Sequence, residues 1–376
     1  MKNRYIIGAV AVTAVLATTS CDDFLNDNRF PLSSQTVNKE FWSNSVNVQN
    51  QINYFYEDYS GYGNGSGSGS FYWSWLSDDQ VGRTAFKDWT FTAVPASSAS
   101  YTAPYTEIRR ASLVIEGVEG STLPETSKAN FIGLARLHRA RSYADLIHRY
   151  NNVPLIKGVV DPSDTEALYG ERTARNEVAD FALADFDYAC TNIAKQSSKT
   201  EFSADLAYAQ KMEFCLFEGS WARYHQKDEV RAKKFFEEAV KAGEAIADRY
   251  PIGSDYSALY KASAKELGGI PALSSNAEVI FMKSYAEGVF MNSITDYSCA
   301  SDGVGGLTKS AFDAFLFVDG KPKASTSCNT TDLGVPSESG VDITNLLEVR
   351  DQRLAQITQP ALMFPGMSWA ASNTVG

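Results

Sequence analysis

Apolar residues recur at steps of three and four between residues 36 and 250, which is the spacing typical of amphipathic helices. The clearest stripe lies within 127–150, and its members are Leu134, Leu137, Ala140, Ala144 and Ile147. A second stripe lies within 173–194, and its members are Val178, Ala182, Phe186, Ala189 and Ile193. Pro154 follows the first stripe closely and helps to end that helix.

Four further segments have the same helical spacing: 36–59, 105–118, 203–225 and 230–249. In the last segment the predicted apolar stripe consists of Phe236, Ala239, Val240, Gly243, Ile246 and Ala247. Antiparallel helix pairs bury one another's stripes, and small residues let the helix axes approach closely. The pattern therefore predicts an array of helix pairs like that of tetratricopeptide (TPR) repeats, although the consensus TPR signature is absent.

The composition of the chain changes after residue 250. Gly, Ser, Pro and Asn become frequent there, and the periodic apolar runs become short. One strand is predicted at 278–283 and one short helix at 310–317. The predicted fold is mainly α, with a TPR-like array at 21–250, an inserted aromatic loop at 60–104, and an irregular, loop-rich region with short strands at 251–376. That last region is expected to be incomplete and to hold the ligand.

The N-terminus has the pattern of a secretory signal peptide at 1–20. Lys2 and Arg4 precede an uncharged, mostly apolar run at 5–17, which is too short for a good transmembrane span. Small residues then lead directly to Cys21. We expect cleavage before this residue, with its thiol carrying the lipid of a lipoprotein; the alternative is a plain signal peptide followed by a chance cysteine.

Aromatic residues make up 12% of the chain, and they cluster at 71–79, directly after a glycine-rich loop at 61–70. Flat rings stack on the apolar faces of sugars, while Asn and Asp bind the hydroxyl groups. The sequence leaves two roles open for this cluster, a ligand platform or a segment that packs under the loop. The candidate ligand residues are Tyr72, Trp73, Trp75, Asp78, Trp89, Phe290, Asn292 and Tyr297.

The net charge of −11 argues against nucleic acid as a partner, because phosphate binding needs a basic face. Cys190 and Cys215 fall within predicted helices and are expected to be core residues, while a Cys299–Cys328 disulfide is left open. No cysteines are spaced as a zinc site, and His138 and His148 are too far apart on one helix to share a metal. We expect no metal and no cofactor.

Catalysis is also not expected. The chain has no GxSxG or HExxH motif, and no pair of carboxylates is singled out as a glycosidase pair. Glu237 and Glu238 are interpreted as a solvated helix face. Asp78 and Asp79, beside the aromatic cluster, are interpreted as hydroxyl acceptors or as a turn cap.

Several segments, in the same order, resemble the SusD/RagB family of nutrient-binding lipoproteins of Bacteroidetes. They are SCDDFL at 20–25, YTEIRRASLVIEGV at 105–118, RLHRARSYADLIHRYNNVPLI at 136–156, RTARNEVADFALADFDYA at 172–189, NAEVIFMKSY at 276–285, VDG at 318–320 and RDQRL at 350–354. Two features depart from the family: the helix after Ser203 reads AYAQKMEFCLFEGSWARYH where the family has a pattern rich in Ala and Leu, and family members continue well past RDQRL.

The resemblance implies an outer-membrane lipoprotein that faces the cell exterior and delivers oligosaccharide to a SusC-like TonB-dependent transporter. Its helical layer would dock on the transporter, and the loop-rich layer would capture the glycan and close as a lid. Two alternatives are a SusD-like protein that captures peptide or another nutrient, and a surface scaffold or adhesin with TPR-like helices.

Overall fold

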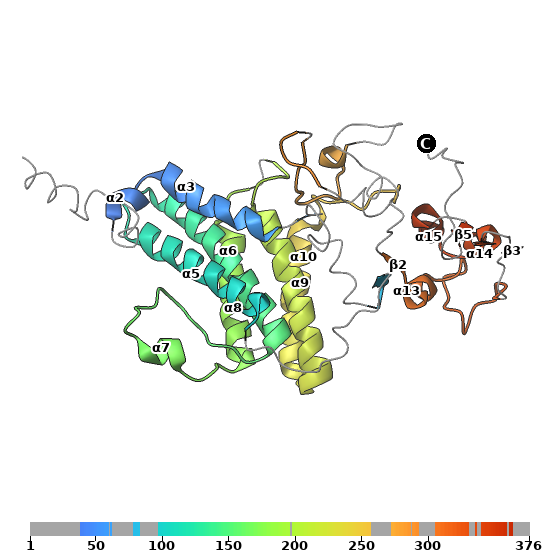
Figure 1. Cartoon of the computed structure of the whole chain (residues 1–376), viewed down its shortest axis with the longest axis horizontal. Coiled ribbons are helices and arrows are strands. Elements are labelled where there is room, and N and C mark those ends of the chain that lie inside the picture. Colours follow the sequence, from blue (N-terminus) through green and yellow to red (C-terminus); the bar gives the residue numbers. More distant parts are fainter. Residues whose placement is uncertain are drawn as a thin grey trace, which may run out of the picture. The chain divides into compact units, whose positions relative to one another are not determined.

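The computed structural model describes residues 38–59, 61, 78–82, 97–195, 198–256, 272–286, 288–292, 305–330, 335–336, 340–358 and 361–363 (Figure 1). The chain divides into two compact units that interleave along the sequence. Unit 1 takes residues up to 55, then 98–195 and 207–239; unit 2 takes 56–97, 196–206 and the residues from 240 onward. The division at residue 250 that composition predicts stays a prediction.

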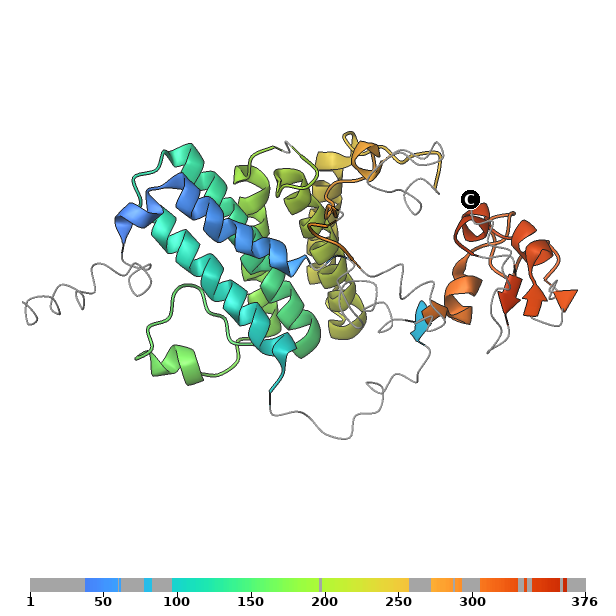
Figure 2. The ribbon, with the colours of Figure 1, turned by 45° about the horizontal axis from the view of Figure 1, so that its top comes forward.

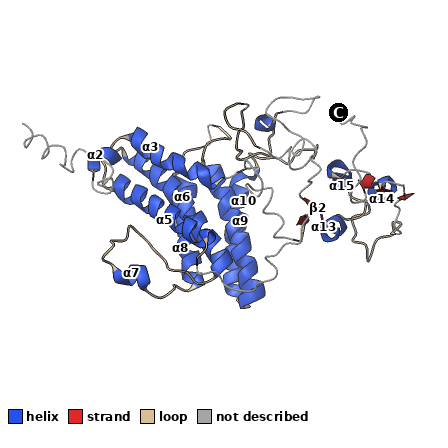
Figure 3. Ribbon diagram, viewed as in Figure 1, coloured by secondary structure: helices blue, strands red, loops and turns tan. Residues whose placement is uncertain are grey.

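Long helices account for most of the described part of unit 1, so the prediction of a mainly α fold is confirmed (Figures 2 and 3). The helices, with two that continue into unit 2, are α2 (Lys39–Trp42), α3 (Ser45–Asn53), α5 (Ala99–Glu119), α6 (Glu125–Tyr150), α7 (Thr165–Tyr169), α8 (Arg175–Asn192), α9 (Ala204–Trp221) and α10 (Glu229–Ala247). The 3-10 turn η2 (Tyr54–Asp58) follows α3, and the π-helical turn η5 (Ala222–Gln226) follows α9.

Helix α6 is the centre of unit 1, because it packs against both α5 and α8 (Figure 1). All five residues of its predicted stripe are buried, and so are all five of the stripe predicted around α8. Burial on α6 goes further than one stripe, since Phe131, His138 and Tyr143 are buried as well. A helix that is covered on several faces belongs to the interior of a helical layer.

Helix α5 begins at Ala99, six positions before the predicted start at Tyr105. Its first turn forms when the amides of Tyr101 and Thr102 donate to the Ser98 carbonyl, at 3.0 and 3.1 Å. Pro104 lies inside the helix and lacks an amide hydrogen. It is the sixth residue of the helix, so it cannot donate a hydrogen bond to the Ser100 carbonyl, and its ring crowds that turn. The predicted start was therefore wrong.

The buried face of α10 also differs from the predicted stripe. The buried residues are Ala232, Phe235, Ala239, Ala242 and Ile246, whereas Val240 and Ala247 are exposed. Adjacent Phe235 and Phe236 make two registers equally plausible from the pattern alone, and α9 decides between them. The Phe235 ring meets Phe214 at 6.1 Å, while Phe236 packs over Gly219, where a Cβ atom would lie 2.7 Å from the ring.

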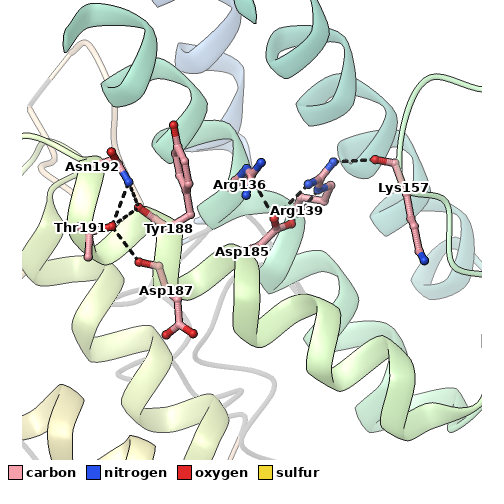
Figure 4. Close-up of polar contacts among 8 residues, drawn as sticks. All are labelled: Arg136, Arg139, Lys157, Asp185, Asp187, Tyr188, Thr191 and Asn192. Carbon is pink, nitrogen blue, oxygen red and sulfur yellow. Dashed lines mark hydrogen bonds and ion pairs between the residues drawn. The ribbon is translucent and has the colours of Figure 1, made fainter. Parts of the chain in front are cut away.

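A buried ion pair joins α6 to α8 in unit 1 (Figure 4). The Arg139 guanidinium donates to both oxygens of Asp185, at 2.7 and 3.0 Å, and Arg136 approaches the same carboxylate at 3.8 Å. Arg139 Nη1 also donates to the Lys157 carbonyl at 2.9 Å. The Tyr143 hydroxyl both donates to the Ile156 carbonyl and accepts from the Ile156 amide, each at 2.7 Å. These contacts hold the segment after α6 against the helices.

The described part of unit 2 contains short elements. Strands β1 (Gln80–Gly82) and β2 (Gly305–Leu307) pair antiparallel, and β3 (Val335–Pro336), β4 (Gly340–Asp342) and β5 (Ala361–Met363) form an antiparallel sheet in that order. Pro336 occupies an edge strand, where its missing amide hydrogen costs least. The remaining elements are η6 (Leu273–Ser275), α13 (Lys309–Ala314), α14 (Thr344–Glu348) and α15 (Gln352–Ile357).

The strand predicted at 278–283 is wrong, because these residues form no strand. The Met282 amide donates to the Lys199 carbonyl at 2.8 Å, but this contact is not extended into a ladder. Phe281 packs instead against the rings of Tyr59 and Phe202, at 5.0 and 5.7 Å. The apolar run at 279–282 therefore contributes Phe281 to a cluster of aromatic rings and forms no strand.

The short helix predicted at 310–317 is confirmed as α13, and Thr308 caps its N-terminus through the Ala311 amide. Arg350 connects this helix to the RDQRL segment. Its buried guanidinium donates to the Phe315 carbonyl at 2.8 Å and to Asp313 at 3.2 Å, and it lies 4.2 Å from the Phe317 ring centroid. Two of the segments on which the resemblance rests, VDG and RDQRL, therefore lie side by side.

Candidate functional site

A tight turn at 286–290 in unit 2 presents the aromatic side chain of Phe290. The amide of Ala286 donates to the Phe290 carbonyl at 2.8 Å, and the Phe290 amide donates back at 2.9 Å. Gly288 makes the turn possible, because its φ of +73° is a conformation that favours glycine. The turn places Phe290 beside Tyr285, and the two rings stack at 5.3 Å with planes 9° apart.

We call Lys283, Tyr285, Phe290 and the turn between them the Tyr285–Phe290 surface. Phe290 remains 47% exposed although it stacks on Tyr285, and Val289 beside it is 85% exposed. Half-exposed rings on a surface offer apolar area that a ligand can cover. Asn292 follows two residues later and is partly buried.

The start of the glycine-rich loop lies against this surface. Gly61 has a φ of +59°, and a Cβ atom there would overlap the Tyr285 hydroxyl and lie 2.9 Å from Lys283 Cδ. Only glycine fits such a close approach. The segment 61–70 therefore begins where Tyr285 and Lys283 lie, although its other residues are outside the described part of the chain.

An aromatic cluster supports the surface within unit 2. Tyr56 stacks on Phe202 at 3.9 Å with planes 11° apart, and its hydroxyl accepts a hydrogen bond from the Phe202 amide at 3.3 Å. Burial raises the pKa of Tyr56. Tyr59 and Phe281 close the cluster, with ring centroids 5.0 Å apart. The cluster meets the surface through Lys283, whose Nζ donates to the Tyr59 carbonyl.

Lys283 supplies the charge of the surface. Its Nζ donates to the Tyr59 carbonyl at 2.6 Å and lies 5.0 Å from the Phe290 ring centroid. Burial lowers the pKa of this ammonium, since water is partly excluded from the charged form.

Few of the ligand residues predicted from the sequence can be located. Phe290 lies on the Tyr285–Phe290 surface and Asn292 follows it. Asp78 is exposed, its carbonyl accepts a hydrogen bond from the Thr308 hydroxyl, and it precedes β1. The other predicted ligand residues, and the lipid-bearing cysteine, lie outside the described residues: Tyr72, Trp73, Trp75, Trp89, Tyr297 and Cys21. The ligand set as a whole stays a prediction.

Sequence reasoning missed Lys283 and Tyr285, although both lie in the segment NAEVIFMKSY. Three alternate residues at its end touch the stretch 59–61: Phe281 meets the Tyr59 ring, Lys283 its carbonyl, and Tyr285 meets Gly61. The part at 278–283 was interpreted as a strand. The signal available in the sequence was the polar end of NAEVIFMKSY, where Lys283 and Tyr285 follow the apolar run.

Cys190 and Cys215 are buried packing residues of unit 1, as predicted, and His138 is buried as well. His138 stacks on Phe55 at 4.3 Å, and burial lowers its pKa. Cys190 and Cys215 are buried free thiols whose pKa burial raises to about 12. Cys328 is a half-buried free thiol, and Cys299 lies outside the described residues.

Glu238 corrects the prediction of a solvated carboxylate pair on α10. Its carboxylate lies 2.7 Å from Lys211, which also pairs with Asp187 at 2.6 Å. Glu237 is exposed and approaches Lys233 at 3.8 Å, so only this residue fits the predicted solvated face. Helix α9 supplies Lys211, a partner that the α10 pattern cannot reveal.

Unit 1 also has a cleft of about 340 Å³ beside α7. Its lining combines backbone with charged side chains such as Lys157, Asp164 and Glu166. The described lining residues include no aromatic ring, so the cleft lacks the flat apolar faces that sugars stack on.

The described ranges contain neither a metal-binding cluster nor a membrane-spanning helix. Within them, no three His, Cys, Asp or Glu side chains are grouped so that they could hold a metal ion. Among the helices in those same ranges, none combines the length and the apolar character needed to cross a bilayer.

Comparison with known proteins identifies the fold. No family model and no curated protein sequence matches the chain. Solved structures do match. A SusD-like carbohydrate binding protein from Bacteroides fragilis NCTC 9343 superposes with a TM-score of 0.62 at 20% identity, covering 84% of this chain and 60% of that one.

Two further structures agree. A SusD-like protein from the same organism gives a TM-score of 0.58 at 21% identity, covering 85% of this chain and 61% of that one. A SusD superfamily protein from Bacteroides vulgatus ATCC 8482 gives a TM-score of 0.52 at 14% identity, covering 76% of this chain and 60% of that one. This chain spans about three fifths of the length of each. The fold of this chain is that of the SusD-like proteins, as the sequence resemblance predicts.

Proposed function

We propose that this chain is a glycan-binding lipoprotein of the SusD/RagB family and that the Tyr285–Phe290 surface contacts the saccharide. The observation that carries the proposal is the half-exposed Phe290 ring, stacked on Tyr285 and held by a tight turn. The likeness of the fold to a structure described as carbohydrate binding supports it.

The physical argument rests on the two faces of a sugar. Its C–H face is apolar and loses little on leaving water, so it stacks on rings such as Phe290, while its hydroxyls need hydrogen-bond partners at the edge. Lys283 supplies a donor next to the ring. Because the surface offers ring area and hydrogen bonds, the proposed role is binding without bond chemistry.

We further propose that the lipid on Cys21 anchors the chain to the outer membrane, facing the cell exterior, beside a SusC-like TonB-dependent transporter. The signal-peptide pattern before Cys21 and the SusD-like fold support this arrangement. In it the helical region 21–250 docks on the transporter, and the region 251–376, with the inserted loop 60–104, captures the ligand.

Calorimetry with a panel of oligosaccharides tests the binding proposal. We expect at least one saccharide to bind, and Phe290→Ala to weaken that binding about fivefold, since a stacked ring contributes about 1 kcal/mol. Ile252→Ala is the control, because Ile252 is an exposed apolar residue of the same unit that is not part of this surface. Binding that is equally strong in all three proteins would contradict the assigned surface, and no binding to any saccharide would contradict the function.

Metabolic labelling tests the anchor. In a host that lipidates proteins, radiolabelled palmitate should enter the wild-type chain and not Cys21→Ala. A wild-type chain that stays unlabelled and retains residues 1–20 would contradict the lipoprotein proposal.

A further inference from the structure

The Lys283 ammonium lies at the centre of the Tyr285–Phe290 surface with an unusual set of neighbours. The Tyr59 carbonyl accepts its hydrogen bond at 2.6 Å, the Phe290 ring lies 5.0 Å away, and the stem passes Gly61. An ammonium has three N–H donors, and the Tyr59 carbonyl takes one of them. The other two have no hydrogen-bond acceptor among the described residues.

No carboxylate of the described residues lies within ion-pair distance of this ammonium. Lys211 makes the contrast. It is also partly buried, but it pairs with Asp187 at 2.6 Å and with Glu238 at 2.7 Å, and these bonds raise its pKa although burial alone would lower it. Burial lowers the pKa of Lys283, where no such pair offsets the lost water.

A half-buried charge without a counter-charge is unfavourable, and it favours any anion that can reach it. A carboxylate is the best match, because an N–H donor on an ammonium makes its strongest hydrogen bonds to ionised oxygens. The exposed Phe290 ring beside Lys283 favours a ligand that also has an apolar ring face. A sugar that bears a carboxylate, such as a uronic or sialic acid, combines both features.

We propose that the saccharide bound at the Tyr285–Phe290 surface is acidic and that Lys283 pairs with its carboxylate. This inference rests on the proposed function and adds the chemical class of the ligand. The net charge of −11 repels anions at a distance, so the recognition must come from the local contact. Added salt would weaken both the long-range repulsion and the local attraction to Lys283. Ligands that differ only in charge report on the local contact.

The test compares matched saccharides by calorimetry: trigalacturonate with its methyl ester, and 3′-sialyllactose with its methyl ester. We expect one acidic member to bind about tenfold or more tightly than its neutral partner, which corresponds to one charge-assisted hydrogen bond. Lys283→Gln should abolish that difference and Lys283→Arg should retain part of it. Lys323→Gln is the control, because Lys323 is exposed in the same unit.

Three outcomes decide the matter. A preference for the acidic member that Lys283→Gln removes supports the inference. Equal binding of both members, or a preference that survives in Lys283→Gln, overturns it and leaves the proposed function standing. No binding by any saccharide overturns both. Thermal unfolding of each variant confirms the fold, and Lys283→Gln should not lower the melting temperature, because it removes a charge that burial disfavours.

Discussion

Arg139 and Asp185 form a bidentate ion pair between α6 and α8, with N–O distances of 2.7 and 3.0 Å (Figure 4). Burial raises the pKa of Asp185 by more than the Arg139 guanidinium lowers it. Desolvation therefore dominates at this carboxylate, and the pair is needed mainly because each charge would otherwise be buried alone.

Replacing one partner of this pair should be costly. Asp185→Asn leaves Arg139 without a counter-charge, so we expect the free energy of unfolding to fall by about 3–5 kcal/mol, measured by urea denaturation. Glu177→Gln removes an exposed ion pair with Lys157 at 3.8 Å and should change it by less than about 0.5 kcal/mol. The double variant Arg139→Met, Asp185→Leu should recover more than half of the loss. A loss below about 1 kcal/mol for Asp185→Asn would contradict this account.

Gly117 allows α5 to approach Trp42. A Cβ atom at this position would overlap the buried Trp42 ring. We expect Gly117→Ala to destabilise the protein by about 1–3 kcal/mol, the usual cost of overpacking a core. Gly120→Ala is the matched control, since its nearest neighbour would be 3.6 Å away, and it should cost little. Equal melting temperatures for the two variants would show that Trp42 can move aside.

Asp319 predicts a pH dependence at the acidic end. The Ser327 amide at 2.9 Å and the Thr326 hydroxyl at 2.8 Å donate to its carboxylate and lower its pKa to about 2. Because the folded pKa lies below the unfolded one, this contribution to stability is full above about pH 4 and is lost as the pH falls through about 2. Wild type should therefore exceed Asp319→Asn in melting temperature near neutral pH, and the gap should close in acid. A carboxyl that titrates near 4 by NMR would argue against these bonds.

The three described cysteines should differ in reactivity. Thiolates are the reactive form, and burial raises the pKa of Cys190 and Cys215 to about 12. Cys328 is half-buried and free. In native protein at mild alkaline pH we expect a thiol reagent to modify Cys328 first, and the other two only after unfolding, as read by peptide mass spectrometry. Labelling of Cys215 as fast as Cys328 would contradict the buried core between α8 and α9.

The long helices of unit 1 could be predicted from the sequence because their stripes are formed by residues within one segment. The stripes of α6 and α8 are local patterns, and all their members are buried. Which face of α10 is buried depends instead on α9. Phe236 packs over Gly219 of that helix, and the Phe235 ring packs against Phe214. Partners of this kind lie outside any local window.

The candidate site was predicted less completely for a similar reason. Phe290 stood out as an aromatic residue in an irregular region. Lys283 and Tyr285 did not, because their role depends on contacts with Tyr59 and Gly61, more than two hundred positions earlier. The apolar run at 279–282, which was interpreted as part of a strand, gave no indication that these segments meet.

Hydrogen exchange with a bound saccharide tests the central claim most directly. The Ala286 and Phe290 amides pair across the turn that carries the stacked rings, so a sugar on this surface should restrain the turn and slow their exchange. The exposed helix α7, where Tyr169 is 84% exposed, is the internal reference and should be unchanged. Slower exchange at 283–291 and not at 165–169 is the predicted result. Slower exchange confined to α7, with none at 283–291, would contradict a ligand site on the Tyr285–Phe290 surface.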